Sequence, residues 1–225
     1  MERAFTDRAE AGRTLAGLLD AYAQRNDVVV LALPRGGVPV AYEVARTLGV
    51  ALDVLVVRKL GVPWQPELAM GAIASGGALY VDEALVREIG LPQTAFDRVL
   101  ASERAELERR EQSYRVQHRM PVEIEGRVAL VVDDGVATGA SMKAAVRALR
   151  ARRPAKIVAA LPVAPPGATQ RLEKDVDEFV CALTPANFYA VGQFYADFSE
   201  TTDDDVRALL AKTDPRGVPC TSPCG

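Results

Sequence analysis

The sequence predicts an α/β fold in which helices flank an open, mostly parallel sheet. Continuous apolar runs alternate with stretches of helical spacing over most of the 225 residues. Runs such as VVVLAL and VALVVD lack polar alternation, which is typical of strands buried on both faces of a parallel sheet. Regular alternation of such strands with helices favours βαβ units.

The first third of the chain supplies two strands and two helices of this pattern. Leu15, Leu18, Leu19 and Tyr22 fall on one helical face. We therefore expect a helix over residues 7–22, a strand over 28–33, a helix over 38–48 and a strand over 52–57. Gly49 ends the second helix, and Arg58 and Lys59 close the second strand.

The middle of the chain departs from the pattern, and we expect an insertion or lid over residues 61–120. Residues 68–81 read as a hairpin with a Ser75-Gly76-Gly77 turn. Two helices are predicted to follow, over residues 82–89 and 94–117. The second helix is highly charged and has only a narrow apolar stripe.

Strand and helix alternate again after the insertion. The predicted strands cover residues 128–133, 156–164 and 178–183. The predicted helices cover residues 141–152, a segment beginning at Pro165-Pro166, and residues 202–210. A small hood, rich in aromatic residues, is expected at residues 184–200. The main domain would then span residues 1–213, with a flexible tail over 214–225.

The composition excludes several classes of partner. Apolar residues make up 49% and charged residues 25%, as in ordinary globular proteins. The net charge of −3 gives no electrostatic reason to expect nucleic acid or an anionic membrane. No stretch approaches the roughly 18 apolar residues of a membrane span. Three cysteines and a charged N-terminus without the apolar core of a secretion signal fit a cytoplasmic protein.

The stretch VVDDGVATGAS, residues 131–141, places two adjacent acids at the end of a predicted strand. Two carboxylates about 4 Å apart repel by up to roughly 4 kcal/mol at an effective dielectric near 20. Such a pair is therefore expected where a ligand binds. In open α/β sheets that place is the carboxyl ends of the strands.

The small residues after the acids predict a phosphate site, because they leave N–H groups open at the start of a helix. Asp133 and Asp134 could then accept hydrogen bonds from hydroxyls of the same ligand, which suggests a ribose 5-phosphate. The residues placed round its phosphate are Val136, Ala137, Thr138, Gly139, Ala140 and Ser141. The alternative is a structural strand–turn–helix with surface carboxylates. The P-loop and G-x-G-x-x-G motifs are both missing.

This motif resembles the phosphoribosyl pyrophosphate (PRPP) signature of type I phosphoribosyltransferases, in which two acids precede T-G-x-[ST]. The order of elements is similar to that family over about residues 25–200, and the chain is most similar to a bacterial subgroup without an assigned substrate. The resemblance implies a type I phosphoribosyltransferase-like fold, PRPP and a nucleobase-like acceptor as substrates, and often a homodimer. It also implies Mg²⁺, held indirectly at Asp133 and Asp134 through water or ribose.

The resemblance also gives a role to PRGG, residues 34–37, which follows the first strand. The family has a loop there that cradles pyrophosphate and often holds a cis or strained peptide. Arg35, Gly36 and Gly37 are therefore expected to bind pyrophosphate, and Arg35 is expected to be catalytic together with the two aspartates. Arg58 and Lys59, which close the second strand, are also expected to bind pyrophosphate. The alternatives are a plain turn and a solvated strand end.

The acceptor side is expected in the hood, where Phe188 and Tyr189 could stack on a flat base. These rings could equally be core packing. Hypoxanthine–guanine enzymes of the family carry Asp where this chain has Ala137, which weighs against a 6-oxopurine, whereas adenine and uracil enzymes carry Ala there.

The function expected from these features is transfer of 5-phosphoribosyl from PRPP to a nitrogenous base, with release of pyrophosphate. Two alternatives are a regulator that binds PRPP or a nucleotide without turnover, and a phosphosugar hydrolase.

Overall fold

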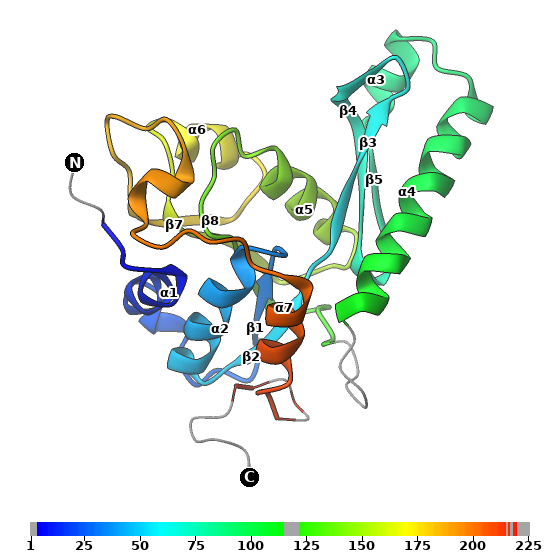
Figure 1. Ribbon diagram of the computed structural model, residues 1–225. Coiled ribbons are helices and arrows are strands. Elements are labelled where there is room, and N and C mark those ends of the chain that lie inside the picture. Colours follow the sequence, from blue (N-terminus) through cyan, green and yellow to red (C-terminus); the bar gives the residue numbers. More distant parts are fainter. Residues whose placement is uncertain (1–3, 115–121, 215, 217, 220–225) are drawn as a thin grey trace.

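The computed structural model describes residues 4–114, 122–214, 216, 218 and 219. Its main sheet has five strands in the order β2-β1-β6-β7-β8, and every neighbouring pair is parallel (Figure 1). The strands are β1 (Val28–Ala32), β2 (Ala51–Val54), β6 (Val128–Val132), β7 (Lys156–Val163) and β8 (Glu178–Leu183). The predicted α/β fold with a parallel sheet is confirmed.

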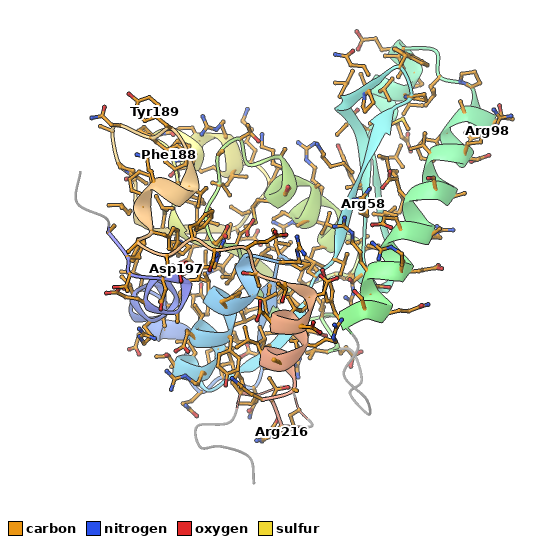
Figure 2. All side chains as sticks on the ribbon, in the orientation of Figure 1. Arg58, Arg98, Phe188, Tyr189, Asp197 and Arg216 are labelled. Atoms are coloured by element: carbon orange, nitrogen blue, oxygen red, sulfur yellow. The ribbon has the colours of Figure 1, made fainter. Side chains whose placement is uncertain are left out.

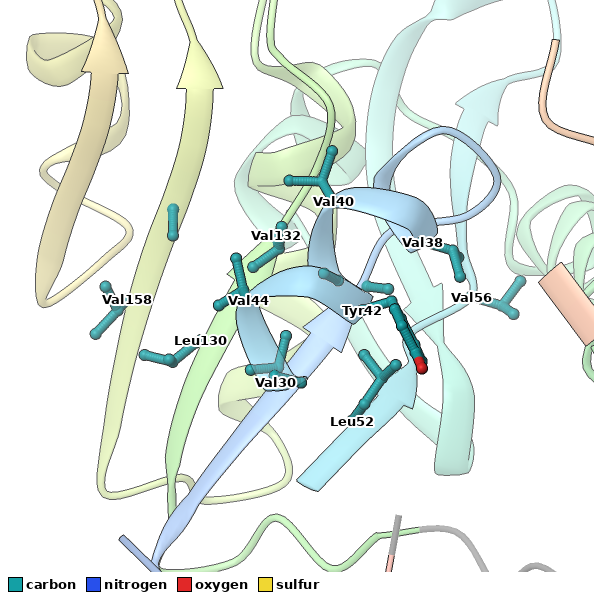
Figure 3. Packing of buried hydrophobic residues seen from close by; sticks show 14 of the residues in the cluster. Val30, Val38, Val40, Tyr42, Val44, Leu52, Val56, Leu130, Val132 and Val158 are labelled. Atoms are coloured by element: carbon teal, nitrogen blue, oxygen red, sulfur yellow. The ribbon is translucent and has the colours of Figure 1, made fainter. Parts of the chain in front are cut away.

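Helices cover both faces of this sheet. Alternate residues of each strand point to opposite faces, so each face packs against its own set of helices. Val30 and Leu130 pack with the helices on one face, and Val29 and Val131 pack with those on the other. The first face carries α1 (Arg8–Gly17), α2 (Gly37–Leu48) and α7 (Asp203–Leu210), and the second carries α5 (Ala140–Arg150) and α6 (Ala168–Leu172). Figure 3 shows the side chains of α2 above β1 and β6.

The helix ends follow from local sequence signals. The Asp7 carboxylate caps α1 by accepting the Glu10 N–H at 2.8 Å. Gly49, with φ 66°, ends α2 in the left-handed conformation. The helix predicted over residues 7–22 is interrupted after Gly17 and continues only as the 3-10 turn η1 (Asp20–Tyr22).

The strand order places a topological switch between β1 and β6. The chain leaves β1 through α2 towards one edge of the sheet, and leaves β6 through α5 towards the other edge. In open parallel sheets a crevice for ligands forms outside the carboxyl ends of the strands at such a point. PRGG follows β1 and the acidic pair follows β6, so both motifs lie at this switch.

A second, antiparallel sheet stands beside the main one and, with two helices, forms what we call the arm, residues 57–114 (Figure 1). Its elements are β3 (Val57–Val62), β4 (Gln65–Ala74), η2 (Ser75–Gly77), β5 (Ala78–Val81), α3 (Glu83–Glu88) and α4 (Gln93–Tyr114). Ile73 packs in the cluster with α4, and Ala72 and Ala74 pack in the cluster with α5. The predicted hairpin is confirmed; the predicted end of the charged helix lies outside the described residues.

The prediction of a single strand over residues 52–57 is wrong. β2 ends at Val54 and β3 begins at Val57, in a different sheet. Leu55 and Val56 make the crossing, where Leu55 N–H donates to Ala32 O at 2.9 Å. Leu55 and Val56 are both buried apolar residues. The apolar run in the sequence therefore continues from one sheet to the other, with no residue that would predict a turn between them.

This crossing also corrects the position of two predicted site residues. Arg58 and Lys59 do not close a strand of the main sheet; they lie within β3, opposite Ile73 and Ala72 of β4.

The hood, residues 184–200, returns over the carboxyl end of the sheet and contains the 3-10 helix η3 (Val191–Phe194). Phe5 forms an isolated bridge with Tyr195, so the N-terminal segment and the hood lie side by side. None of the helices in the described ranges is long and apolar enough to cross a membrane.

Candidate functional site

The two motifs at the switch point are in direct contact. A Cβ atom on Gly36 would stand 2.1 Å from Asp134 Oδ2, and one on Gly37 would stand 2.9 Å from Asp133 Cα. Only glycine allows the start of α2 to approach the acidic pair so closely. The Pro34-Arg35 peptide bond just before is cis. The structure thus joins PRGG and the acidic pair into one site.

The two carboxylates are partly buried and close to each other. Asp133 Oδ1 accepts the backbone N–H of Asp134 at 2.9 Å. Burial raises the pKa of Asp133 well above its usual range, and the negative charge of Asp134 raises it further. Burial also raises the pKa of Asp134, although the Arg8 guanidinium opposes the shift. Hydrogen-bond donors or positive charge brought by a ligand would therefore stabilise the ionised pair.

Two residues at this site were not predicted from the sequence. Arg8 Nε donates to Asp134 Oδ2 at 2.8 Å, and the Tyr195 hydroxyl donates to Asp134 O at 2.6 Å. Burial raises the pKa of the Tyr195 phenol, so it stays a donor. They lie 126 and 61 positions from Asp134 in the chain, and only the aromatic richness of the hood hinted at such a contact.

The loop between the acids and α5 leaves most of its amides without a partner. Val136 N–H donates to Val163 O at 3.2 Å, and Ala140 N–H donates to Thr138 Oγ1 at 3.3 Å. Within the described part of the chain, four other amides between positions 136 and 141 have no acceptor: those of Ala137, Thr138, Gly139 and Ser141.

Gly139 is the N-cap of α5, with φ 80° and no side-chain cap. Ala137, Thr138, Ala140 and Ser141 are exposed. Free amides at the positive end of a helix bind phosphate groups. The geometry of the loop therefore suits a phosphate, as its composition predicts.

Arg35 directly precedes Gly36, which meets the acidic pair, but the Arg35 side chain is engaged elsewhere. Its guanidinium pairs with Glu200 and lies 3.8 Å from Asp203 Oδ1. Asp203 Oδ1 also accepts the Tyr114 hydroxyl at 3.1 Å. An anionic ligand at Arg35 would thus compete with the carboxylates of Glu200 and Asp203.

Two of the predicted site residues lie within β3 of the arm. Arg58 lies on the arm (Figure 2), where its Nε is 2.7 Å from Glu103 Oε2 of α4. Lys59 is next to it in β3. Their expected contact with pyrophosphate stays a prediction.

The two hood aromatics have different environments. The Phe188 ring stacks on buried Phe194, with centroids 5.6 Å apart, so it contributes to packing. Tyr189 is 84% exposed, and Figure 2 shows both on the hood side of the molecule. Of the pair, Tyr189 has the ring that a ligand could reach.

The carboxylate oxygens of the site suit a hard cation that binds together with a ligand. Among the residues the structure describes, no group of three or more His, Cys, Asp or Glu side chains could hold a metal ion. Asp133 and Asp134 offer two carboxylates. Mg²⁺ is commonly held by one or two carboxylates together with substrate phosphates and water. The pair therefore fits Mg²⁺ bound jointly with a phosphorylated ligand.

Comparisons with known proteins agree with this geometry. The family model described as "Phosphoribosyl transferase domain" matches residues 4–199. Two Mycobacterium tuberculosis proteins named "Putative phosphoribosyl transferase", from strains H37Rv and CDC 1551 / Oshkosh, are 50% identical over 206 residues, or 92% of this chain. The chain spans 46% of the length of these curated relatives. The crystal structure of TT1426 from Thermus thermophilus is 45% identical, with a TM-score of 0.83 over 92% of this chain and 97% of that one.

Proposed function

The chain belongs to the phosphoribosyl transferase domain family, and we propose that it transfers the 5-phosphoribosyl group of PRPP to a nitrogenous base. The bond from C1 of ribose to the pyrophosphate oxygen breaks, and pyrophosphate leaves with the electron pair. A bond from a ring nitrogen of the base to C1 forms, and the proton of that nitrogen passes to pyrophosphate or to solvent. The proposal rests on one observation, the contact of Gly36 with Asp134. This contact brings the loop with open amides, the acidic pair and PRGG together at one switch point.

The sugar end of PRPP is assigned to the loop after β6. The unpartnered amides of Ala137, Thr138, Gly139 and Ser141 would bind the 5-phosphate at the start of α5. Asp133 and Asp134 would accept the ribose 2′- and 3′-hydroxyls. A buried carboxylate pair gains most from such donors, because they offset both burial and mutual repulsion.

The pyrophosphate end is assigned to PRGG. Negative charge increases on pyrophosphate as the C1–O bond breaks, so donors that face it lower the barrier. Arg35 offers a forked cationic donor, and Gly36, which is partly exposed, is the N-cap of α2. Gly37 is buried and its N–H donates to Leu33 O at 3.1 Å, so its part is the close approach of α2 to the acidic pair. Positioning and charge stabilisation, rather than proton transfer by the protein, would supply most of the rate.

Mg²⁺ would be held at Asp133 and Asp134 indirectly, through water or ribose, and would supply charge neutralisation for pyrophosphate. The chain itself contributes the partly buried acidic pair. Burial raises the pKa of both carboxyls, so the ionised pair has room for further stabilising partners.

The acceptor is proposed to be a base other than a 6-oxopurine, because exposed Ala137 stands where that class of enzyme carries a carboxylate. Tyr189, with its exposed ring, is the hood residue best placed to stack on a flat base. That the arm covers the site, and that the protein forms a homodimer, stay predictions.

The test is a turnover assay with PRPP, Mg²⁺ and a panel of nucleobases. Base-dependent release of pyrophosphate supports the transferase. Binding of PRPP without any turnover would replace it by a regulator, and base-independent loss of phosphate would replace it by a hydrolase. A Tyr189→Ala variant should raise the KM for the base and leave that for PRPP unchanged.

A further inference from the structure

Arg8 connects the acidic pair to the hood through a single side chain. In addition to the bond from its Nε to Asp134, its Nη1 donates to the carbonyl oxygen of Ser199 at 2.7 Å. Its guanidinium carbon also lies 4.0 Å from the centre of the Phe198 ring. The guanidinium is thus held by a carboxylate, a carbonyl and an aromatic face at once.

This contact differs from the ion pairs on the surface. The side chains of Arg8 and Asp134 are only 12% and 15% exposed, whereas those of the Arg25–Asp27 pair are 42% and 55% exposed. Exposed pairs contribute little and hold no fixed geometry. A planar guanidinium fixed on three sides has one orientation, and so it fixes the group that it binds.

The contact leaves a particular oxygen of Asp134 available. Oδ2 is the oxygen bound by Arg8 and the one against Gly36. The Asp134 carboxylate also shares a hydrogen bond with the Asp133 side chain, and no other residue described donates to Oδ1. The Tyr195 hydroxyl meanwhile fixes the Asp134 carbonyl. Main chain and one carboxylate oxygen are thus held, and the second oxygen is left to accept from a ligand.

We propose that Arg8 is a positioning residue for ribose recognition, an inference that rests on the proposed function. By holding Oδ2, it orients Oδ1 of Asp134 towards a sugar hydroxyl, and through Ser199 and Phe198 it makes that orientation depend on the seated hood. Arg8 acts through Asp134 and not on the phosphate loop, whose open amides lie between Ala137 and Ser141.

The test compares two ligands in calorimetric titrations of an Arg8→Met variant. Affinity for PRPP with Mg²⁺ should fall by about tenfold to a hundredfold, the range for loss of one hydrogen bond to a charged group. Affinity for inorganic phosphate should stay the same, because the loop amides are untouched. Arg13→Met is the matched control: Arg13 is on the same helix, is half exposed and pairs with Glu43 at 3.8 Å. It should change neither affinity.

An Arg8→Lys variant separates charge from packing. It should recover part of the lost PRPP affinity, since an ammonium can still donate to the carboxylate. Equal loss in the Met and Lys variants, or a Met variant that binds PRPP as the wild type does, would overturn the inference while leaving the transferase proposal intact. Tighter PRPP binding in the Met variant would overturn it too, because Arg8 would then compete with the sugar. A wild-type protein that binds PRPP no better than phosphate would overturn the proposed function itself.

Discussion

Gly36 lies directly against the carboxylate of Asp134, so that a Cβ atom at position 36 would stand 2.1 Å from Asp134 Oδ2. The two residues are far apart in the chain and meet because β1 and β6 are neighbours in the sheet. Gly36 has φ −58° and ψ −31°, which any residue adopts. The glycine is therefore required by the contact and not by its backbone conformation.

Gly36→Ala should displace the Asp134 carboxylate and with it the bond to Arg8. We expect PRPP binding to be lost and the free energy of unfolding to fall by about 1–3 kcal/mol, the usual cost of overpacking. Gly17→Ala is the control, because a Cβ there meets nothing within 4 Å. Calorimetry with PRPP and denaturant unfolding measure both. Undiminished PRPP binding in Gly36→Ala would refute the close approach of the two loops.

Asp133→Asn should stabilise the protein increasingly as pH rises above about 4, the unfolded pKa of aspartate. Burial raises the folded pKa of Asp133, so the folded state holds a proton that the unfolded state has lost. That contribution to stability is complete below the unfolded pKa and is lost as pH rises through the folded pKa. The difference in Tm, variant minus wild type, should grow from near zero at pH about 4 to a positive value at neutral pH.

Asp27→Asn should change Tm with pH in the opposite direction to Asp133→Asn. A hydrogen bond from Arg25 lowers the pKa of Asp27, so its stabilisation appears above the unfolded pKa and disappears as pH falls. Removing it should lower Tm at neutral pH relative to acid pH. If the two variants show the same pH trend, Asp133 is not buried as described.

Gly139→Ala should weaken phosphate binding through the backbone. Gly139 has φ 80°, and a Cβ would meet only Leu172, at an ordinary 3.5 Å. The substitution therefore costs about 1–2 kcal/mol from the left-handed conformation and shifts the loop amides, rather than crowding the ligand. Gly167→Ala is matched to it, as Gly167 has φ 78° and is the N-cap of α6. Both should lower stability alike, but only Gly139→Ala should lose affinity for inorganic phosphate; loss in both would indicate a general effect of strain.

Glu200→Gln should strengthen pyrophosphate binding. Glu200 pairs with Arg35 and is 74% exposed, so the pair is worth up to about 1 kcal/mol, or roughly fivefold in affinity. Arg35→Ala should weaken pyrophosphate binding more than ribose 5-phosphate binding. Glu83→Gln removes the same charge from the arm and should have no effect. Pyrophosphate titration measures all three, and a Glu200→Gln variant with unchanged or weaker binding would argue against pyrophosphate at Arg35.

The sequence was sufficient for the main sheet because its strands are continuous apolar runs with clear helix signals between them. It was insufficient at Leu55 and Val56, where the chain changes sheets while both side chains stay buried. The pattern of apolar residues shows which residues are buried but not which sheet they join. It therefore predicts Arg58 and Lys59 at the end of a main-sheet strand, whereas they lie within β3 of the second sheet.

The site shows the same limit. The open amides of the loop after β6 could be predicted, because they depend on the local residues from Asp133 to Ser141. The partners of Asp134 could not, because Arg8 and Tyr195 reach it only through tertiary packing of the N-terminal helix and hood.

The most direct test of the account is a calorimetric titration of PRPP with Mg²⁺ into the wild-type protein and an Asp133→Asn, Asp134→Asn double variant. We predict saturable binding to the wild type and none to the double variant. The two substitutions should have opposite effects on Tm, because Asp133→Asn removes a carboxylate that burial destabilises, whereas Asp134→Asn leaves the Arg8 guanidinium without its charged partner. Equal PRPP affinity in the two proteins, or no binding to the wild type, would contradict the assignment of a phosphorylated ribose to this loop.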